Sequence, residues 1–290
     1  MDDAVSILTD FSKEAFDVEL LDEIFAIVGN SLDPQNDAAK AAVVALEKNP
    51  DIWIRSNFII DGCRSTDAKL FGLKVLTYAV RLRWEVITTQ GRDAIVAYIS
   101  YKIKLLASTF ELYEANNSLL APLNMLRVYI LEQHGQDAWP AFITDIVESS
   151  AMSESLCENS MKLLQLLPVT VLSTDVLSPA KQEETKNSLR GEFSRLFELF
   201  ERTLSTSTSP SVINAALECL KGFVKWLPWS CIFETTLLSD ILPKYLLQKT
   251  HRQVTVFRFI PDIQQKRPLL YLRACCSKKY RWPELRCWIP

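Results

Sequence analysis

The residue types on which most enzyme chemistry depends are few in this sequence and are poorly spaced for it. Among 290 residues there are 2 histidines, and His134 and His251 lie far apart along the chain. The sequence has no glycine-rich phosphate loop and neither the G-x-S-x-G nor the H-E-x-x-H pattern, which place a bound phosphate, a serine nucleophile or a zinc ion. We therefore predict that the protein is not an enzyme and needs no cofactor, and we interpret His134 as a surface or helix-end residue.

Metal ligands and paired carboxylates give no better candidate. The sequence has 7 cysteines, of which Cys275, Cys276 and Cys287 lie close together, but these lack the spacing and the fourth ligand of a zinc site. Glu183 and Glu184 are adjacent in a segment that is typical of a solvated helix or loop. We expect no metal site, so the function must come from a surface that binds other molecules.

Apolar residues recur every three or four positions between Pro122 and Pro168, which is the spacing of one face of a helix. Three helix-length patterns are present, and Trp139-Pro140 and Ser153 mark where the second and third begin. The apolar positions are Leu123, Leu126 and Ile130, then Phe142 and Ile146, then Leu156, Leu163 and Leu167. One helix cannot bury its stripe alone, so these helices are predicted to pack as hairpins.

The same spacing extends from Val18 to Ile241, and no segment of strand periodicity interrupts it. The second helix of each predicted pair begins near residues 36, 66, 116, 153 and 210. The mean step of about 43 residues lies within the ~40–47 residue period of HEAT repeats. We therefore predict an all-α fold, an α-α superhelix (HEAT-repeat solenoid) that forms a truncated arc with a concave binding face.

Two segments are interpreted from the local pattern alone. The spacing of Ile95, Ile99, Ile103, Leu106 and Phe110 predicts one long helix. The serine, threonine and proline residues between positions 168 and 182 predict a loop.

The composition is that of an ordinary globular chain, with 48% hydrophobic and 23% charged residues. Its 7 glycines are too few for a turn-rich all-β fold, and no apolar run approaches the ~18 residues of a membrane-spanning helix. The opening MDDAVSILTDF is acidic where a secretory signal would be basic. We expect a cytosolic or nuclear chain without a membrane partner.

The net charge of −3 hides an uneven distribution along the chain. Residues 251–290 carry 9 Lys and Arg against 2 Asp and Glu, whereas residues 1–250 carry 23 against 33. An acidic body of this kind favours a basic protein surface as its partner over nucleic acid.

Several stretches of the chain resemble one protein family. They include LNMLRVYIL, WPAFITDIV and SESLCENSMKLLQLL in the middle, NPDIWIR and KLFGLKVL nearer the start, and GEFSRLFELF and KWLPWSCIFETTLL nearer the end. These stretches are similar to the N-terminal part of the nuclear exportin for leucine-rich signals. That exportin is one of the karyopherin-β (importin-β-like) transport receptors, and the resemblance covers residues 1–247.

The resemblance implies a division of the chain and a set of partners. We expect N-terminal helices at 1–35, an importin-β-type N-terminal domain at 36–104, exportin-like HEAT repeats at 105–247 and a divergent basic tail at 248–290. In this family the inner helices of the first repeats hold the small GTPase Ran in its GTP form. Export-complex and nuclear pore proteins are further partners, and the receptors shuttle between nucleus and cytoplasm.

By resemblance, the Ran-binding surface maps to helices that start near Asn36, Thr66 and Asn117. The side chains that the apolar stripes leave available for contact are Lys40, Lys74, Tyr78, Asn124 and Arg127. The alternative interpretation of each residue is that its side chain contacts only solvent. The cargo groove of the family lies in middle repeats that this chain lacks, so the resemblance implies Ran-GTP as partner and no cargo site.

Some positions depart from the family pattern. His134-Gly135 stands where family members often have Trp-Pro, and Pro168-Val169 replaces an acidic pair. Lys74 and Arg127 occupy positions that are usually uncharged. These departures keep open a second interpretation, in which the chain is a HEAT scaffold that bridges proteins without binding a GTPase.

The tail is predicted to be disordered or loosely attached to the body. Residues 248–290 have 4 Pro, 6 aromatic residues and 3 Cys but no sustained helical stripe. We interpret them as a misread exon boundary or a shifted reading frame, the alternatives being a basic nucleic-acid-binding tail and a genuine extension. Limited proteolysis should trim the chain to a stable product that ends near Leu247, and a tail as resistant as the body would contradict this prediction.

Overall fold

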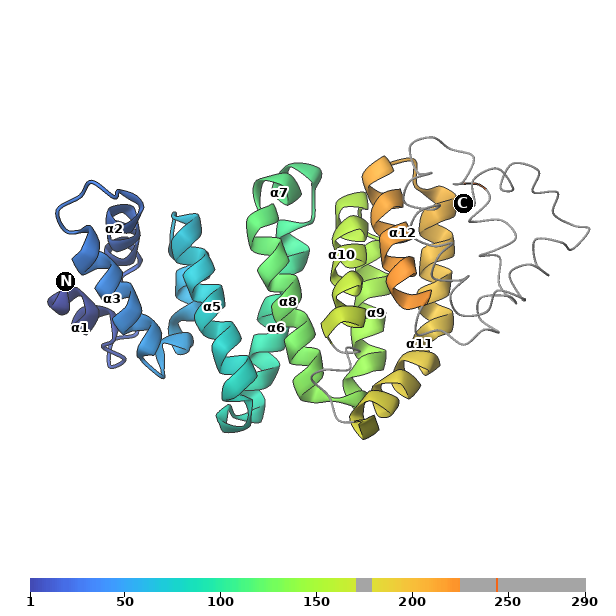
Figure 1. The fold of residues 1–290 in the computed structure, drawn as a ribbon, viewed down its shortest axis with the longest axis horizontal. Coiled ribbons are helices and arrows are strands. Elements are labelled where there is room, and N and C mark those ends of the chain that lie inside the picture. Colours follow the sequence, from blue (N-terminus) through green and yellow to red (C-terminus); the bar gives the residue numbers. More distant parts are fainter. Residues whose placement is uncertain (171–178, 225–243, 245–290) are drawn as a thin grey trace, which may run out of the picture. The chain divides into compact units, whose positions relative to one another are not determined.

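The computed structural model describes residues 1–170, 179–224 and 244, which form helices and connecting turns. These ranges contain twelve α-helices and three short 3-10 helices, and no strand occurs within them (Figure 1). The predicted all-α class of HEAT-type helical pairs is therefore confirmed. None of the helices in these ranges is both long and apolar enough to cross a membrane.

The chain divides into two units, Met1–Ala138 and Trp139–Pro290. The first is built of α1 (Asp2–Leu8), α2 (Val18–Gly29), α3 (Asn36–Lys48), η1 (Ile52–Arg55), α4 (Ser56–Gly62), α5 (Thr66–Leu82), η2 (Trp84–Val86), α6 (Thr89–Leu106), α7 (Phe110–Ala115), α8 (Asn117–His134) and η3 (Gln136–Ala138). The second contains α9 (Trp139–Ser150), α10 (Glu154–Thr170), α11 (Pro179–Thr206) and α12 (Pro210–Val224).

Within these units the helices pack as pairs, α2 with α3, α4 with α5, α6 with α8, α9 with α10 and α11 with α12. The second helices of the pairs begin at Asn36, Thr66, Asn117, Glu154 and Pro210. The starts predicted near residues 36, 66, 116, 153 and 210 are thus confirmed to within one residue. Neighbouring pairs of one unit also touch through their second helices, α5 against α8 and α10 against α12 (Figure 1).

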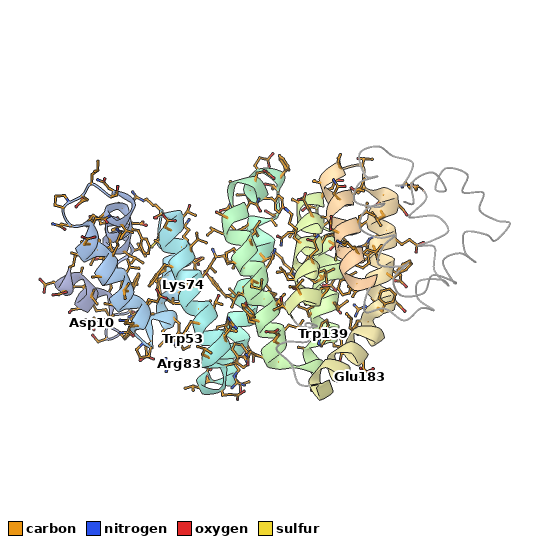
Figure 2. All side chains as sticks on the ribbon, viewed as in Figure 1. Asp10, Trp53, Lys74, Arg83, Trp139 and Glu183 are labelled. Atoms are coloured by element: carbon orange, nitrogen blue, oxygen red, sulfur yellow. The ribbon has the colours of Figure 1, made fainter. Side chains whose placement is uncertain are left out.

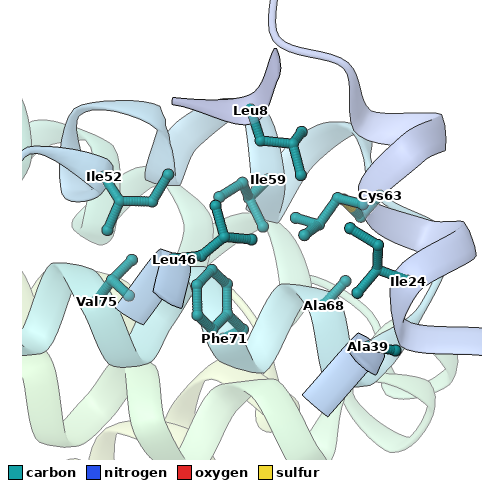
Figure 3. Packing of buried hydrophobic residues seen from close by; sticks show 11 residues of the cluster. Leu8, Ile24, Ala39, Leu46, Ile52, Ile59, Cys63, Ala68, Phe71 and Val75 are labelled. Atoms are coloured by element: carbon teal, nitrogen blue, oxygen red, sulfur yellow. The ribbon is translucent and has the colours of Figure 1, made fainter. Parts of the chain in front are cut away.

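The core of the first unit joins α2, α3, α4 and α5. Phe71 and Val75 of α5 belong to one buried cluster with Leu46 of α3 and Ile59 of α4 (Figure 3). The Phe71 ring centroid lies 5.7 Å from that of Phe25 on α2. Because burial of each large apolar side chain contributes about 1.5–3 kcal/mol, this shared cluster fixes how α5 sits against its neighbours.

A buried amide fixes the start of α3. The Asn36 side-chain nitrogen donates hydrogen bonds to the carbonyl oxygens of Ile27 (2.8 Å), Val28 (3.0 Å) and Asn30 (3.0 Å). These carbonyls belong to the end of α2 or follow it, where helical partners are lacking. The amide therefore closes the turn between α2 and α3 and sets the position of α3.

The second unit is held by contacts of α9 with α11 and of α10 with both α9 and α12. The rings of Phe200 on α11 and Phe223 on α12 have centroids 6.1 Å apart. The Gln165 side-chain amide of α10 donates to the Ala215 carbonyl of α12 at 2.9 Å. Trp139, labelled in Figure 2, is buried at the start of α9, where the sequence predicts a helix to begin.

The long helix predicted through Phe110 is wrong at its C-terminal end. Helix α6 ends at Leu106. The Thr109 hydroxyl then accepts a hydrogen bond from the Leu112 amide at 3.3 Å, which caps a new helix, α7. Phe110 is 67% exposed and so belongs to no buried stripe.

The loop predicted between residues 168 and 182 is wrong at both ends. Helix α10 continues through Pro168 to Thr170, and α11 begins at Pro179. Pro168 is buried in the last turn of α10, and a Cβ added to Gly222 of α12 would lie 3.2 Å from its ring. Packing against α12 therefore outweighs the preference of proline for helix ends. Residues 171–178 and the tail predicted at 248–290 lie outside the described part of the chain.

Gly72 allows α4 and α5 to approach each other closely. A Cβ at this position would lie 2.9 Å from Cγ2 of Ile59 and 3.1 Å from Cγ1 of Ile60, both buried. Overpacking of a core costs about 1–3 kcal/mol, which exceeds the ~1 kcal/mol that alanine gains over glycine in a helix. We predict that Gly72→Ala lowers the free energy of unfolding, measured by urea denaturation.

The matched control is Gly29→Ala at the end of α2. Nothing lies within 4 Å of a Cβ added there, so this substitution should be neutral or stabilising. Equal unfolding midpoints for the two variants would show that α4 and α5 are not packed as described.

Candidate binding surface

The five residues singled out from the sequence lie on the second helices of three pairs in the first unit. Lys40 is on α3, Lys74 and Tyr78 are on α5, and Asn124 and Arg127 are on α8. Each of these helices buries one face in the core and leaves another face exposed. The face on which a residue lies therefore decides whether it can contact a partner.

The exposed face of α5 presents Lys74, Tyr78 and Arg81, which are spaced four and three residues apart. Tyr78 is 59% exposed. Lys74, labelled in Figure 2, places its Nζ 2.7 Å from Oε1 of Glu47 on α3. Because such an exposed ion pair contributes only about 0–1 kcal/mol, a partner protein can replace it at little cost.

Lys40 shares the exposed side of α3 with Glu47. The two residues are separated by two helical turns, and both are exposed. The structure therefore places Lys40, Lys74 and Tyr78 as exposed groups on two helices that an ion pair joins.

Asn124 and Arg127 lie on a different side of α8. Asn124 is only 3% exposed, and Arg127 is half-buried. Both follow the helical spacing of Leu120 and Leu131, which are buried. The structure does not bring Asn124 to the exposed surface, because the face of α8 that carries it is packed.

Three residues that the sequence reasoning missed extend the exposed surface from α5 to α8. The guanidinium of Arg81 lies over the ring of Tyr129 on α8, 4.7 Å from its centroid. This cation–π contact joins the two helices. Glu132 follows Tyr129 by three residues and lies on the same side of α8. One signal in the sequence could have identified Tyr129 and Glu132. They are three residues apart and do not share the helical spacing of the buried leucines, which places them on another face of the helix.

Glu132 is the electrostatically unusual group of this surface. Its side chain is half-buried, and within the described residues its carboxylate has neither an ion pair nor a hydrogen bond. Burial raises the pKa of Glu132 to about 7, and the positive charge of Arg81 opposes that rise. The ionised carboxylate is therefore poorly solvated and poorly compensated.

The cysteines and His134 have structural roles. Cys63, Cys157 and Cys219 are buried free thiols, and burial raises the pKa of each, so they pack as small apolar groups. His134 is exposed at the end of α8, where its ring and that of Trp84 pack edge to face with their centroids 5.2 Å apart. No cluster of His, Cys, Asp or Glu that could hold a metal ion occurs in the described ranges.

Comparison with known proteins identifies the family. The profile of the family described as "Exportin 1-like protein" matches residues 116–257. The chain is 31% identical over 256 residues to Exportin-1 of Drosophila melanogaster, an alignment that covers 88% of this chain. It is 32% identical over 258 residues, or 87% of this chain, to Protein EXPORTIN 1A of Arabidopsis thaliana. The chain belongs to the exportin 1-like family. It is also 24% identical over 193 residues to Exportin-5 of Homo sapiens, which covers 59% of this chain.

This exportin 1-like chain spans about a quarter of the length of the curated relatives it matches, 24% of both the fly and the Arabidopsis protein. The family match ends at residue 257. It therefore extends past Leu247, where the sequence stretches alone place the end of the resemblance.

Replacing Glu132 by glutamine should stabilise the fold more at pH 8 than at pH 4.5. The folded-state pKa of about 7 lies above the ~4.3 of an unfolded chain, so ionisation of Glu132 lowers stability as pH rises between these values. The full difference of about 2.7 pKa units corresponds to about 3.7 kcal/mol. Because solvent screens a half-buried carboxylate, we expect a gain of about 1 kcal/mol at pH 8, measured by urea denaturation.

Glu114→Gln on the exposed side of α7 removes the same charge elsewhere and is the control. It should change stability little at either pH. The same pH response in both variants would mean that Glu132 does not ionise in a half-buried setting.

Proposed function

We propose that this chain is the N-terminal portion of a nuclear export receptor and that its first unit binds the small GTPase Ran in the GTP-bound state. The observation that carries the proposal is the similarity to Exportin-1 over 88% of the chain. The packing of the described helices as successive pairs supports it, because such pairs present extended surfaces for binding proteins. The proposed function is binding, with no catalytic step and no cofactor.

A receptor of this kind works on both sides of the nuclear envelope. We therefore propose that the protein shuttles between nucleus and cytoplasm and meets export-complex and nuclear pore proteins there. The cargo groove that the family resemblance implies lies in later repeats, so no cargo is assigned to these residues.

The exposed side of α3, α5 and α8 is the surface that we propose for the GTPase. Lys40, Lys74 and Tyr78 are proposed as direct contacts, because all three are exposed there. Asn124 and Arg127 lie on the packed side of α8 and are proposed to orient that helix.

Selectivity for the GTP form follows from the shape of the GTPase. Its switch segments are ordered differently with and without the γ-phosphate, so a fixed helical surface fits one state better. A quarter-length chain lacks the gain in effective concentration that linked contact sites provide. We expect a dissociation constant in the micromolar range or weaker, which corresponds to a binding free energy of about −8 kcal/mol or one less favourable than that.

A helical scaffold that bridges proteins without binding a GTPase is the second candidate function. The observation that favours it is the ion pair between Lys74 and Glu47, which occupies the lysine at 2.7 Å. If that pair persists in every complex, Lys74 is unavailable to a GTPase.

Calorimetry of the chain with Ran separates the two candidates. Ran loaded with a non-hydrolysable GTP analogue should bind, and Ran loaded with GDP should bind much more weakly. Residues 1–250 carry 33 Asp and Glu against 23 Lys and Arg, so the affinity should fall with added salt. Equal affinity for the two forms, or none for either, would favour the scaffold.

Tyr78→Ala should weaken binding of the GTP-loaded form about tenfold, since aromatic anchors at interfaces contribute about 1–2 kcal/mol or more each. The control is Tyr101→Ala on α6, because Tyr101 is also 59% exposed but lies on the first helix of its pair. A larger loss for Tyr101→Ala would place the binding surface on the other side of the unit.

A further inference from the structure

Glu132 lies on the exposed side of α8 without a partner for its charge. Its side chain is half-buried, and no described residue forms an ion pair or a hydrogen bond with its carboxylate. A carboxylate in this setting loses part of its hydration, and the charge of Arg81 offsets this loss only in part. A cation brought to it by another molecule would supply the missing interaction.

The nearby cation of the same chain, Arg81, contacts an aromatic ring instead of the Glu132 carboxylate. Arg81 of α5 acts on Glu132 through its positive charge, but its guanidinium lies over the Tyr129 ring at 4.7 Å. Lys74, two turns earlier on α5, is paired with Glu47 of α3 at 2.7 Å.

Two charged groups at the start of α6 act at a different place on α8. Arg92 and Asp93 influence His134, at the end of α8. Arg127, on the packed side of α8, also acts on His134. Among the described residues, the charge that acts on Glu132 is that of Arg81, which forms no ion pair with it.

We propose that Glu132 is the docking point for a basic side chain of the protein that binds the exposed side of α5 and α8. The Arg81 guanidinium lies over the Tyr129 ring and forms no ion pair with the carboxylate. This inference rests on the proposed function and adds to it a residue that selects for a lysine or an arginine on the partner. A partly desolvated charge pair at an interface adds specificity, because a partner without the cation leaves the carboxylate unpaired.

Binding of a basic side chain at this point depends on the ionisation of Glu132. Only the ionised carboxylate attracts a cation, and burial raises the pKa of Glu132 to about 7 in the free chain. The ionised fraction is then about nine-tenths at pH 8 and about one-tenth at pH 6, so the affinity should fall about tenfold between these values. Binding at pH 7 should also release a fraction of a proton.

Calorimetry with Ran loaded with the GTP analogue tests this at pH 6 and pH 8, in two buffers with different ionisation enthalpies. We compare the full chain, Glu132→Gln and the control Glu114→Gln, which removes a carboxylate from the exposed side of α7. The full chain and Glu114→Gln should share the tenfold pH effect. Glu132→Gln should bind more weakly at pH 8 and lose most of that effect, and titration of Ran itself would persist in all three.

The possible results separate this inference from the proposed function. If all three proteins bind the GTP form with the same pH dependence, Glu132 is not the docking point, although the proposed function stands. If none of the three binds at either pH, the proposed function fails and the inference fails with it.

Discussion

The structure depends on one constraint, which is that each helix must bury a single apolar stripe against its neighbours. On α5 this stripe includes Phe71 and Val75, which pack with residues of α3 and α4. Once that stripe is buried, the helical period fixes the opposite face, so Lys74 and Tyr78 become exposed. The proposed binding surface is therefore a consequence of the core, and a change that reorients α5 would alter both.

Much of this architecture could be predicted from the sequence. Each helix shows apolar residues at helical spacing, and many helices begin at a residue whose side chain can cap the first turn. Ser65 accepts a hydrogen bond from the Ala68 amide at the start of α5, and such hydroxyls are visible in the sequence. The break between α6 and α7 and the end of α10 could not be predicted in this way. The first depends on whether Thr109 caps a new helix, and the second on packing of Pro168 against a helix more than forty residues later in the chain.

The candidate surface was predictable only in part. The side chains of Lys40, Lys74 and Tyr78 are exposed, and a polar residue opposite an apolar stripe is expected to be. Asn124 shows the limit, since its polar side chain lies on a packed face. Glu132 was missed because its importance comes from partial burial without a partner, which exists only after α5 and α8 have packed together. Its residue type and spacing alone do not distinguish it from a solvated glutamate.

The central claim is that the second helices of the first unit form the GTPase-binding surface of an exportin 1-like chain. Hydrogen–deuterium exchange of the full chain, with and without saturating Ran bound to a GTP analogue, tests it most directly. Our account predicts slower exchange in α3, α5 and α8, with little change in α2, α4 and α6. Slower exchange confined to α2, α4 and α6, or no change in any helix of the first unit, would contradict it.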